Sequence, residues 1–255
     1  MVDHSQMKLG MNPPRFDART LRAVNYMLPG LPPAKPAVDW LKPVVKFPMY
    51  ANNRYGDCAI AGIGHMVQVW SANVGTPVTP SEAEILRVYR LLSPDDQGCV
   101  LLDVLKYWRL NPICGIKLGA FAAVDLNDQN EIKVTLDLFG GLYGGALLPI
   151  AAQKQKVWEV VSGRKGEPGS WGGHCTSWGQ YADGELRCVT WGQTKDATWA
   201  WLNKYAVELW ALITPAWFGP EGKSPAGLDI ERLKSDLEVI GGVPPEASDS
   251  ELRWA

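Results

Sequence analysis

Residues Asn52–Trp70, NNRYGDCAIAGIGHMVQVW, decide the fold that this sequence predicts. Turn-forming residues come first, and apolar residues then recur at helical spacing, at Ile60, Ile63, Met66, Val67 and Trp70. The spacing predicts a helix that begins near Asp57 or Cys58. A thiol there lies beside unpaired N–H groups and the positive end of the helix dipole, which favour the thiolate. Asp57 opposes this effect unless its carboxylate caps the helix. Cys58 is therefore either a nucleophile or a buried structural thiol.

A second informative stretch is 170–193, SWGGHCTSWGQYADGELRCVTWGQ. Two strand-like runs flank Asp183-Gly184, a dipeptide that favours a two-residue hairpin turn. His174 stands at the start of the first run, directly after two glycines. A cysteine at a helix start and a distant histidine at a strand start are the components of a thiolate–imidazolium pair.

Three motifs together resemble the papain-like cysteine peptidase superfamily. They are Asn52-x5-Cys58 before a helix, Gly173-His174 opening a strand that reaches Gly179-Gln180-Tyr181, and Thr190-Trp191-Gly192 at the end of the hairpin. The resemblance covers roughly residues 38–217 and is closest to a divergent bacterial or bacteriophage branch. Two positions depart from the family pattern, because Asn52 stands where a Gln is usual and Val189 where an Asn is usual.

The resemblance implies an α+β, two-lobed papain-like fold with a helical lobe and an antiparallel β lobe. Outside the resemblance, the prolines of residues 1–45 predict an extended N-terminal arm, with one short helix expected at 18–27 and capped by Asp17. The papain-like domain would follow at 46–216, divided into a helical lobe at about 57–112 and a β lobe at about 113–216. Residues 217–255 would form a C-terminal extension, in which Ile230–Ile240 has the apolar periodicity of a helix.

The function implied is a cysteine hydrolase that cleaves a peptide or amide bond. Cys58 would attack the acyl carbon, and His174 would take up the thiol proton and later protonate the leaving group. The resemblance also assigns Asn52 to the oxyanion hole, together with the backbone N–H of Cys58. Asn52 is one methylene shorter than Gln, so the neighbouring Asn53 is the fallback.

The residue that orients His174 stays open at this stage. Alignment on Trp191-Gly192 places Val189 there, and valine cannot accept a hydrogen bond. Counting sixteen residues from His174 gives Thr190. A two-residue turn at Asp183-Gly184 pairs residues whose numbers sum to 367, which puts Gln193 opposite His174. We expect Gln193, then Thr190, with a plain Cys58–His174 dyad as the remaining alternative.

The same departures support a competing class, a catalytically degenerate papain-like structural protein of a phage virion or another assembly. Both ends of the chain exceed what a papain-like core needs. An extended arm must lie on its own core or on a partner, which could be a second copy or an assembly component. The sequence thus supports two partner classes, a peptide or amide substrate and a docking partner for the terminal extensions.

The charge balance and the residue composition argue against several other classes of protein. The 255 residues carry 25 basic and 27 acidic side chains, which argues against nucleic acid and a membrane surface as partners. Asp3 and His4 interrupt any apolar leader, and five cysteines without CxxC spacing indicate a reduced, cytoplasmic protein, or a virion protein if phage-derived. The remaining cysteines and His65 are expected in the core, and His4 in the arm predicts nothing. No cofactor or metal is expected, and the 12 tryptophans suit a core or a binding surface.

Overall fold

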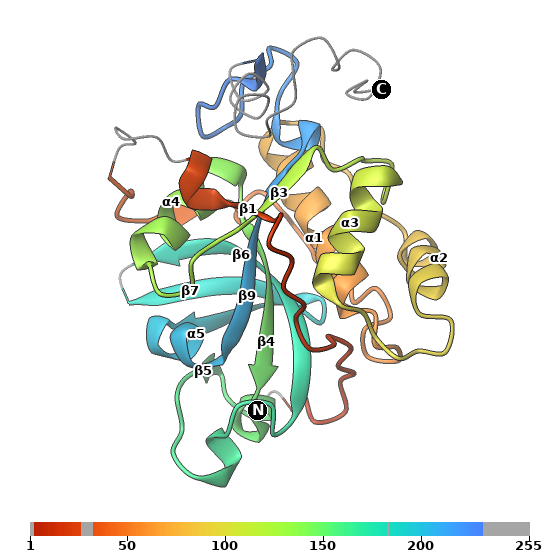
Figure 1. Ribbon diagram of the computed structural model, residues 1–255, viewed down its shortest axis with the longest axis vertical. Coiled ribbons are helices and arrows are strands. Elements are labelled where there is room, and N and C mark those ends of the chain that lie inside the picture. The colour runs from red at the N-terminus through yellow and green to blue at the C-terminus, as the bar shows by residue number, and fades with distance from the viewer. Residues whose placement is uncertain (1–2, 27–32, 183, 232–255) are drawn as a thin grey trace.

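The computed structural model describes residues 3–26, 33–182 and 184–231, and it has the predicted α+β architecture (Figure 1). After two short strands and a 3-10 turn, three helices follow one another: α1 (Cys58–Asn73), α2 (Glu82–Leu92) and α3 (Leu101–Leu110). The helix predicted after Asn52 therefore begins at Cys58. Helix α1 is buried on nearly all sides because it lies between the sheet and the other two helices.

The strands of the described residues join one sheet in the order β1-β3-β9-β4-β6-β7-β8-β5, with β2 on the end of β6. Their bounds are β1 Leu21–Arg22, β2 Val38–Asp39, β3 Ala120–Ala123, β4 Leu142–Leu148, β5 Val157–Trp158, β6 Gly172–Ala182, β7 Glu185–Thr190, β8 Gln193–Thr198 and β9 Ala206–Ile213. All strand pairs are antiparallel except β1–β3 and β5–β8. The mainly antiparallel sheet after a helical part matches the predicted order of lobes.

Strand β6 is the long central strand and carries His174 near its start. It pairs with β4 on one side and β7 on the other. The β6–β7 register shifts between Trp178 and Gln180, so Gly179 forms a bulge. Pairs beyond the bulge follow the predicted hairpin register, whereas Ser177 and Trp178 pair one residue out of it.

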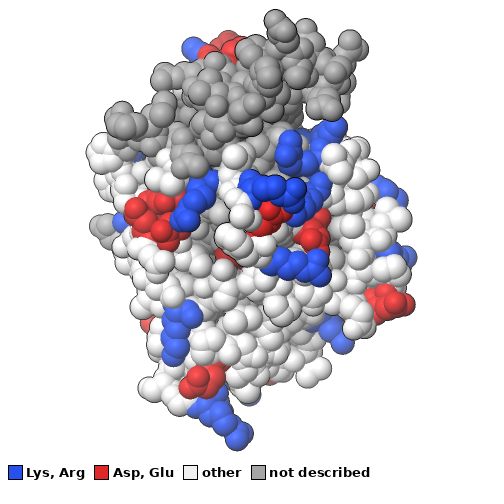
Figure 2. Space-filling model, in the orientation of Figure 1, with Lys and Arg blue, Asp and Glu red and all other residues white. Residues whose placement is uncertain are grey.

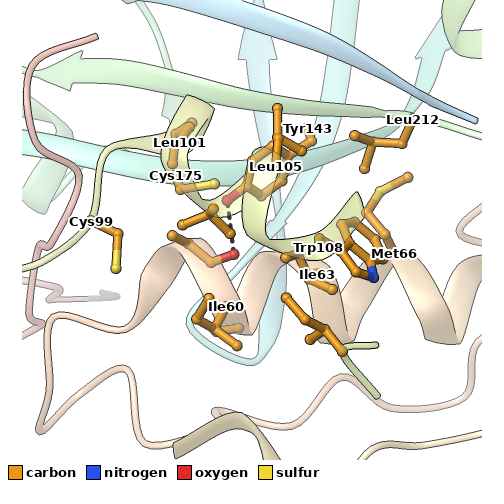
Figure 3. Close-up of a cluster of buried hydrophobic side chains, with 14 of the residues drawn as sticks. Ile60, Ile63, Met66, Cys99, Leu101, Leu105, Trp108, Tyr143, Cys175 and Leu212 are labelled. Atoms are coloured by element: carbon orange, nitrogen blue, oxygen red, sulfur yellow. Dashed lines mark hydrogen bonds between the residues drawn. The ribbon is translucent and has the colours of Figure 1, made fainter. Parts of the chain in front are cut away.

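Helix α1 packs against the face of the sheet that carries Tyr143 and Cys175. The Tyr143 hydroxyl donates to the Ala59 carbonyl at 2.9 Å, the contact drawn as a dashed line in Figure 3. Two further helices, α4 (Gln129–Phe139) and α5 (Trp199–Tyr205), pack with a separate cluster that includes Trp158, Trp178 and Trp201. Most of the tryptophans that the sequence left between core and surface are thus core residues.

The part of residues 1–45 that the structure describes is integrated into the fold. In place of the helix expected at 18–27, strand β1 and a 3-10 turn at Ala23–Tyr26 occupy this stretch. The carboxylate that was expected to cap that helix, Asp17, instead bonds Arg19 and, at 2.7 Å, Lys106 of α3. The helix expected at Ile230–Ile240 falls almost wholly outside the described residues.

Charged side chains do not form a single field on the face shown in Figure 2, where basic and acidic groups lie beside one another. Ion pairs such as Arg15–Asp103 at 2.7 Å join groups of opposite sign. Within 3–26, 33–182 and 184–231, the structure has no helix that is both long and apolar enough to cross a bilayer.

Candidate active site

Cys58 is the first residue of α1, and the Asp57 carbonyl accepts the first helical hydrogen bonds, from Ile60 and Ala61. The cysteine is 1% exposed. Burial raises the pKa of its thiol to about 12, although the N–H of Cys175, 3.4 Å from the sulfur, acts in the opposite direction. The helix terminus therefore does not make a thiolate while Cys58 is covered.

The carboxyl group of Asp57 is also buried and makes no helix cap. Burial raises its pKa to about 8, while the Asn52 amide beside it acts to lower it. A carboxyl with this pKa is largely protonated at neutral pH. The charge that would oppose a Cys58 thiolate is thus mostly absent in the folded protein.

His174 lies on β6 directly before Cys175, so its backbone adjoins the residue that contacts the Cys58 sulfur. Its ring is fully buried and stacks on Trp191, with ring centroids 4.3 Å apart. Burial lowers the pKa of His174 to about 3, so the ring is neutral. The Nδ1 atom makes no hydrogen bond, with Cys58 or with any other group among the described residues.

The second ring nitrogen of His174 contacts Thr190. Its Nε2 atom and the Thr190 hydroxyl share a hydrogen bond of 2.7 Å. Val189 points away into a small core cluster with Leu41, Phe47 and Val69. Thr190, the second of the expected candidates, therefore occupies the position beside the ring.

Gln193, the first candidate for that role, contacts a different histidine. Its side-chain amide lies 2.7 Å from Nε2 of His4, in the N-terminal arm. Strand β7 ends at Thr190, and Trp191 and Gly192 form a turn with φ of 47° and 70°. This turn and the Gly179 bulge invalidate the simple pairing that placed Gln193 opposite His174.

Asn52 is buried in the turn before α1. Its amide donates to the Tyr55 carbonyl at 3.3 Å, and its backbone carbonyl accepts from Lys8 at 3.3 Å. Its amide is thus engaged within the turn in this conformation. The fallback residue, Asn53, is exposed.

The N-terminal arm runs between the helices and the sheet, as the red trace in Figure 1 shows. On the helical side, Cys99 donates to Gly10 at 2.8 Å and accepts from Asn12 at 2.9 Å. On the sheet side, Met11 donates to Gly173 at 3.1 Å. The arm is therefore held by backbone hydrogen bonds on both sides of the seam that contains Cys58 and His174.

Gly10 is the tightest point of the arm. A Cβ atom added there would lie 1.7 Å from the Gly56 carbonyl oxygen, two residues before Cys58. A Cβ atom added at Gly98, before α3, would in turn lie 2.2 Å from the Gly10 carbonyl oxygen. Only a residue without a side chain fits between these two backbones.

The other predicted core residues lie in the core. His65 is buried and its Nε2 contacts the Pro48 carbonyl at 2.9 Å, while burial lowers its pKa to about 4. All five cysteines are buried and unpaired. The described residues contain no group of three His, Cys, Asp or Glu side chains arranged to hold a metal ion.

Sequence reasoning missed the arm's part in the site. His4, which predicted nothing by itself, is buried against Trp191, and Met11 is buried between Cys99 and Gly173. Gly10, between two apolar residues, was the one local signal of a close backbone contact.

Comparison with solved structures identifies the architecture. Xylellain, a cysteine protease from Xylella fastidiosa, matches with a TM-score of 0.62 and 14% identity, over 82% of this chain and 97% of that one. Procathepsin B S9 from Trypanosoma congolense matches with a TM-score of 0.53 and 11% identity, over 83% and 88%. A Carica candamarcensis cysteine protease, in complex with E-64, matches with a TM-score of 0.52 and 13% identity, over 70% and 98%.

No protein-family model matches the sequence, and no curated protein sequence matches it. Identities of 11–14% establish the fold and leave the function to the residues of this chain. The predicted resemblance is confirmed at that level. The chain is a divergent protein with the papain-like fold, in which an N-terminal arm lies across the seam between helices and sheet.

Proposed function

We propose that this protein is a cysteine hydrolase of papain-like type, held latent by its own N-terminal arm, that cleaves a peptide or amide bond. One observation carries the proposal: a thiol at the start of a helix lies against the backbone beside a histidine whose Nε2 is already bonded to Thr190. The Nδ1 atom of that histidine is left without a partner. It is the ring atom available to accept a proton from Cys58.

The resting chemistry is that of a neutral pair. Burial holds the Cys58 thiol protonated and the His174 ring unprotonated. Both shifts have the same physical cause, because the charged forms lose their hydration under the arm. Withdrawal of the arm would admit water and substrate and would move both pKa values back toward the range in which an ion pair forms.

In the open enzyme, the Cys58 proton passes to Nδ1 of His174 and the thiolate attacks the carbonyl carbon of the substrate. The tetrahedral oxyanion is stabilised by the backbone N–H of Cys58 and by the Asn52 amide, which must turn from the Tyr55 carbonyl. His174 then protonates the departing amine, leaving an acyl-enzyme. A water molecule, deprotonated by His174, releases the acid and restores the thiol.

Thr190 acts in this scheme by fixing the ring. Its hydroxyl can accept a hydrogen bond from Nε2–H, which selects the tautomer with a free Nδ1 lone pair. It would also stabilise the imidazolium that forms after proton transfer. Thr190 is thus proposed as the orienting residue, in preference to Gln193 and to an unassisted Cys–His dyad.

The test uses the full chain with Gly10→Ala, a change that cannot be accommodated beside the Gly56 carbonyl. An epoxide-type thiol reagent, followed by mass mapping, should label Cys58 below neutral pH and leave the other four cysteines unlabelled. Gly219→Ala is the matched control, because its Cβ would meet its nearest atom at an ordinary 3.7 Å. Adding His174→Ala should move the labelling toward the unperturbed thiol pKa of about 8.5.

Slow labelling of Cys58 in Gly10→Ala that rises only near pH 8.5 and ignores His174→Ala would reject the hydrolase. It would favour the second candidate, a catalytically degenerate structural protein. The observations behind that alternative are the valine at position 189 and the closed seam. An assembly protein should tolerate Cys58→Ala and fail when residues 232–255, the part of its proposed docking extension beyond the buried Trp217, are removed, whereas an enzyme should lose its function with Cys58→Ala.

A further inference from the structure

Asp57 is a buried acid that the mechanism proposed above leaves without a role. It stands directly before Cys58 and is fully buried, although its side chain makes no hydrogen bond to the helix that it precedes. Both of its carboxyl oxygens lack a hydrogen-bond partner among the described residues. Because a buried carboxyl group without a partner is costly, it marks a place where the resting chain leaves a polar contact unmade.

The titratable groups that act on Asp57 are acids and thiols from the helical side of the molecule. They are Glu82 on α2, Asp96 in the loop after α2, Cys58 on α1 and Cys99 before α3. Burial, and secondarily the two acids, raise the pKa of Asp57 to about 8. The carboxyl group is therefore mainly a neutral acid, which has an O–H donor as well as a carbonyl acceptor.

The neutral polar group beside this acid is the Asn52 amide, which acts to lower the pKa of Asp57. The two residues stand at the two ends of the turn that leads into α1, and both are buried. In the resting chain the amide donates instead to the Tyr55 carbonyl, over a long 3.3 Å. The proposed open enzyme requires the amide to leave that carbonyl, and the amide then needs a new partner within reach.

A carboxylic acid and a primary amide are complementary in their hydrogen bonds. The acid O–H can donate to the amide oxygen while one amide N–H donates to the acid carbonyl, and the second N–H then points away from the pair. Such a pair would use both unpartnered oxygens of Asp57. It would also leave Asn52 with a single N–H directed outward, as a donor to an oxyanion must be.

We propose that Asp57 is a positioning residue, which holds the Asn52 amide through this pair of hydrogen bonds in the open protein and directs the free N–H toward the oxyanion. Asn52 is one methylene shorter than glutamine, so a partner behind it is needed to fix the direction of the short amide. That the free N–H meets an oxyanion rests on the hydrolase proposed above; the pairing of the two side chains does not.

The first test needs no catalysis. In the full chain with Gly10→Ala and Cys58→Ala, the side-chain amide resonances of Asn52 are followed by NMR as the pH is raised. We expect them to shift in one step when Asp57 ionises, because the carboxylate loses the O–H that donates to the amide oxygen. The step should vanish in Asp57→Asn, whose own amide supplies a donor and an acceptor at every pH. The pairing is wrong if the step is absent, or if it survives in Asp57→Asn.

The second test asks whether the pairing serves an oxyanion. In full-length Gly10→Ala, Cys58 is treated with the aldehyde N-acetyl-phenylalanyl-glycinal, whose adduct places an oxygen in the oxyanion hole, or with methyl methanethiosulfonate, which reacts at sulfur and forms no oxyanion. Asp57→Leu is similar in shape to the wild type and removes no helix cap, because Asp57 makes none. We expect it to weaken aldehyde binding about tenfold, which corresponds to about 1.4 kcal/mol, and to leave the rate with the thiosulfonate unchanged. Asp57→Asn should restore aldehyde binding.

Asn52→Ala should weaken aldehyde binding as well, and adding Asp57→Leu to it should cause no further loss, because the two residues act as one unit. An equal loss with both reagents would mean that Asp57 acts on the thiol itself and would overturn the proposal. Aldehyde binding that ignores Asp57→Leu would overturn it too and leave the hydrolase standing. If no variant binds the aldehyde while the Asn52 resonances still follow Asp57, the hydrolase fails and the pairing of the two side chains stands.

Discussion

The aromatic core behind the sheet and the seam that holds the arm are stabilised by different means. In the core, Trp158 and Trp201 are fully buried and stack with ring centroids 4.6 Å apart. In the seam, the arm is held by backbone hydrogen bonds, and between residues 3 and 12 only His4 and Met11 are buried. The packed side chains of the core can separate only when the whole domain unfolds. The arm buries only two side chains and can leave the seam while the rest of the domain stays folded.

The largest effect should come from the core. Trp201→Ala removes a fully buried indole, and we expect it to lower the free energy of unfolding by about 3–5 kcal/mol. Urea unfolding measures this change. The control is Trp199→Ala, two residues away and only partly buried, which should cost much less; equal costs would contradict the division into core and seam.

Thr190, which contacts His174, should show an intermediate effect. Thr190→Val keeps the shape but leaves His174 Nε2 unbonded, which costs about 1–3 kcal/mol for a buried polar group. In the Gly10→Ala background it should also slow Cys58 labelling below neutral pH. Thr190→Ser retains the hydroxyl and should restore both properties. Labelling that is unaffected by Thr190→Val would remove Thr190 from the site.

An effect of similar size, but confined to the arm, is expected for Gly10→Ala. The arm would lose its place, at a cost of about 1.5–3 kcal/mol if that cost is mainly the burial of one side chain such as Met11. Hydrogen exchange should show lost protection at the Met11 and Asn12 amides, while β6 amides such as Cys175 keep theirs. Loss of protection throughout β6 would mean that the arm is part of the core.

The smallest effect should come from a change of pH, which alters the charge of His4 in the arm. Burial, and secondarily Lys195 on β8, lower the pKa of His4, while Asp3 opposes them. The pKa of His4 is thus lower when the arm is docked than when the arm is free. Because the free arm binds protons more readily, docking of the arm is favoured above about pH 6.5 and weakens as the pH falls below this value. Protonation of Nε2 also places a second donor against the Gln193 amide.

We therefore expect Cys58 labelling of the wild type to rise between about pH 6.5 and 5, the range just below the unperturbed histidine pKa. In the His4→Gln variant this rise in labelling should be smaller. Part of the rise should remain, because His174 and His65 also have pKa values that are lowered by burial and also favour opening when they are protonated. An identical pH profile for both proteins would show that protonation of His4 does not release the arm.

Those features of the site that depend on local signals could be predicted from the sequence. The apolar spacing after Cys58 placed the start of α1, and Gly173-His174 placed the histidine at a strand start. The partner of His174 could not be chosen, because the Gly179 bulge shifts the hairpin register by one residue. A single bulge has no distinctive local pattern in a strand that already contains several glycines.

The arm was beyond sequence reasoning for another reason. An extended proline-rich segment has no periodicity, so nothing in it specifies which surface it will cover. Its place is set by contacts with Gly56, Cys99 and Gly173, which are distant in the chain.

The closed seam also has a consequence for the durability of the thiol. Oxidants attack cysteines that are exposed and ionised, and oxidation beyond the sulfenic acid is essentially irreversible. With the arm in place, Cys58 is neither exposed nor ionised. The arm thus protects Cys58 from oxidation, and the Cys58 thiol should survive exposure to peroxide for as long as residues 4–12 remain in the seam.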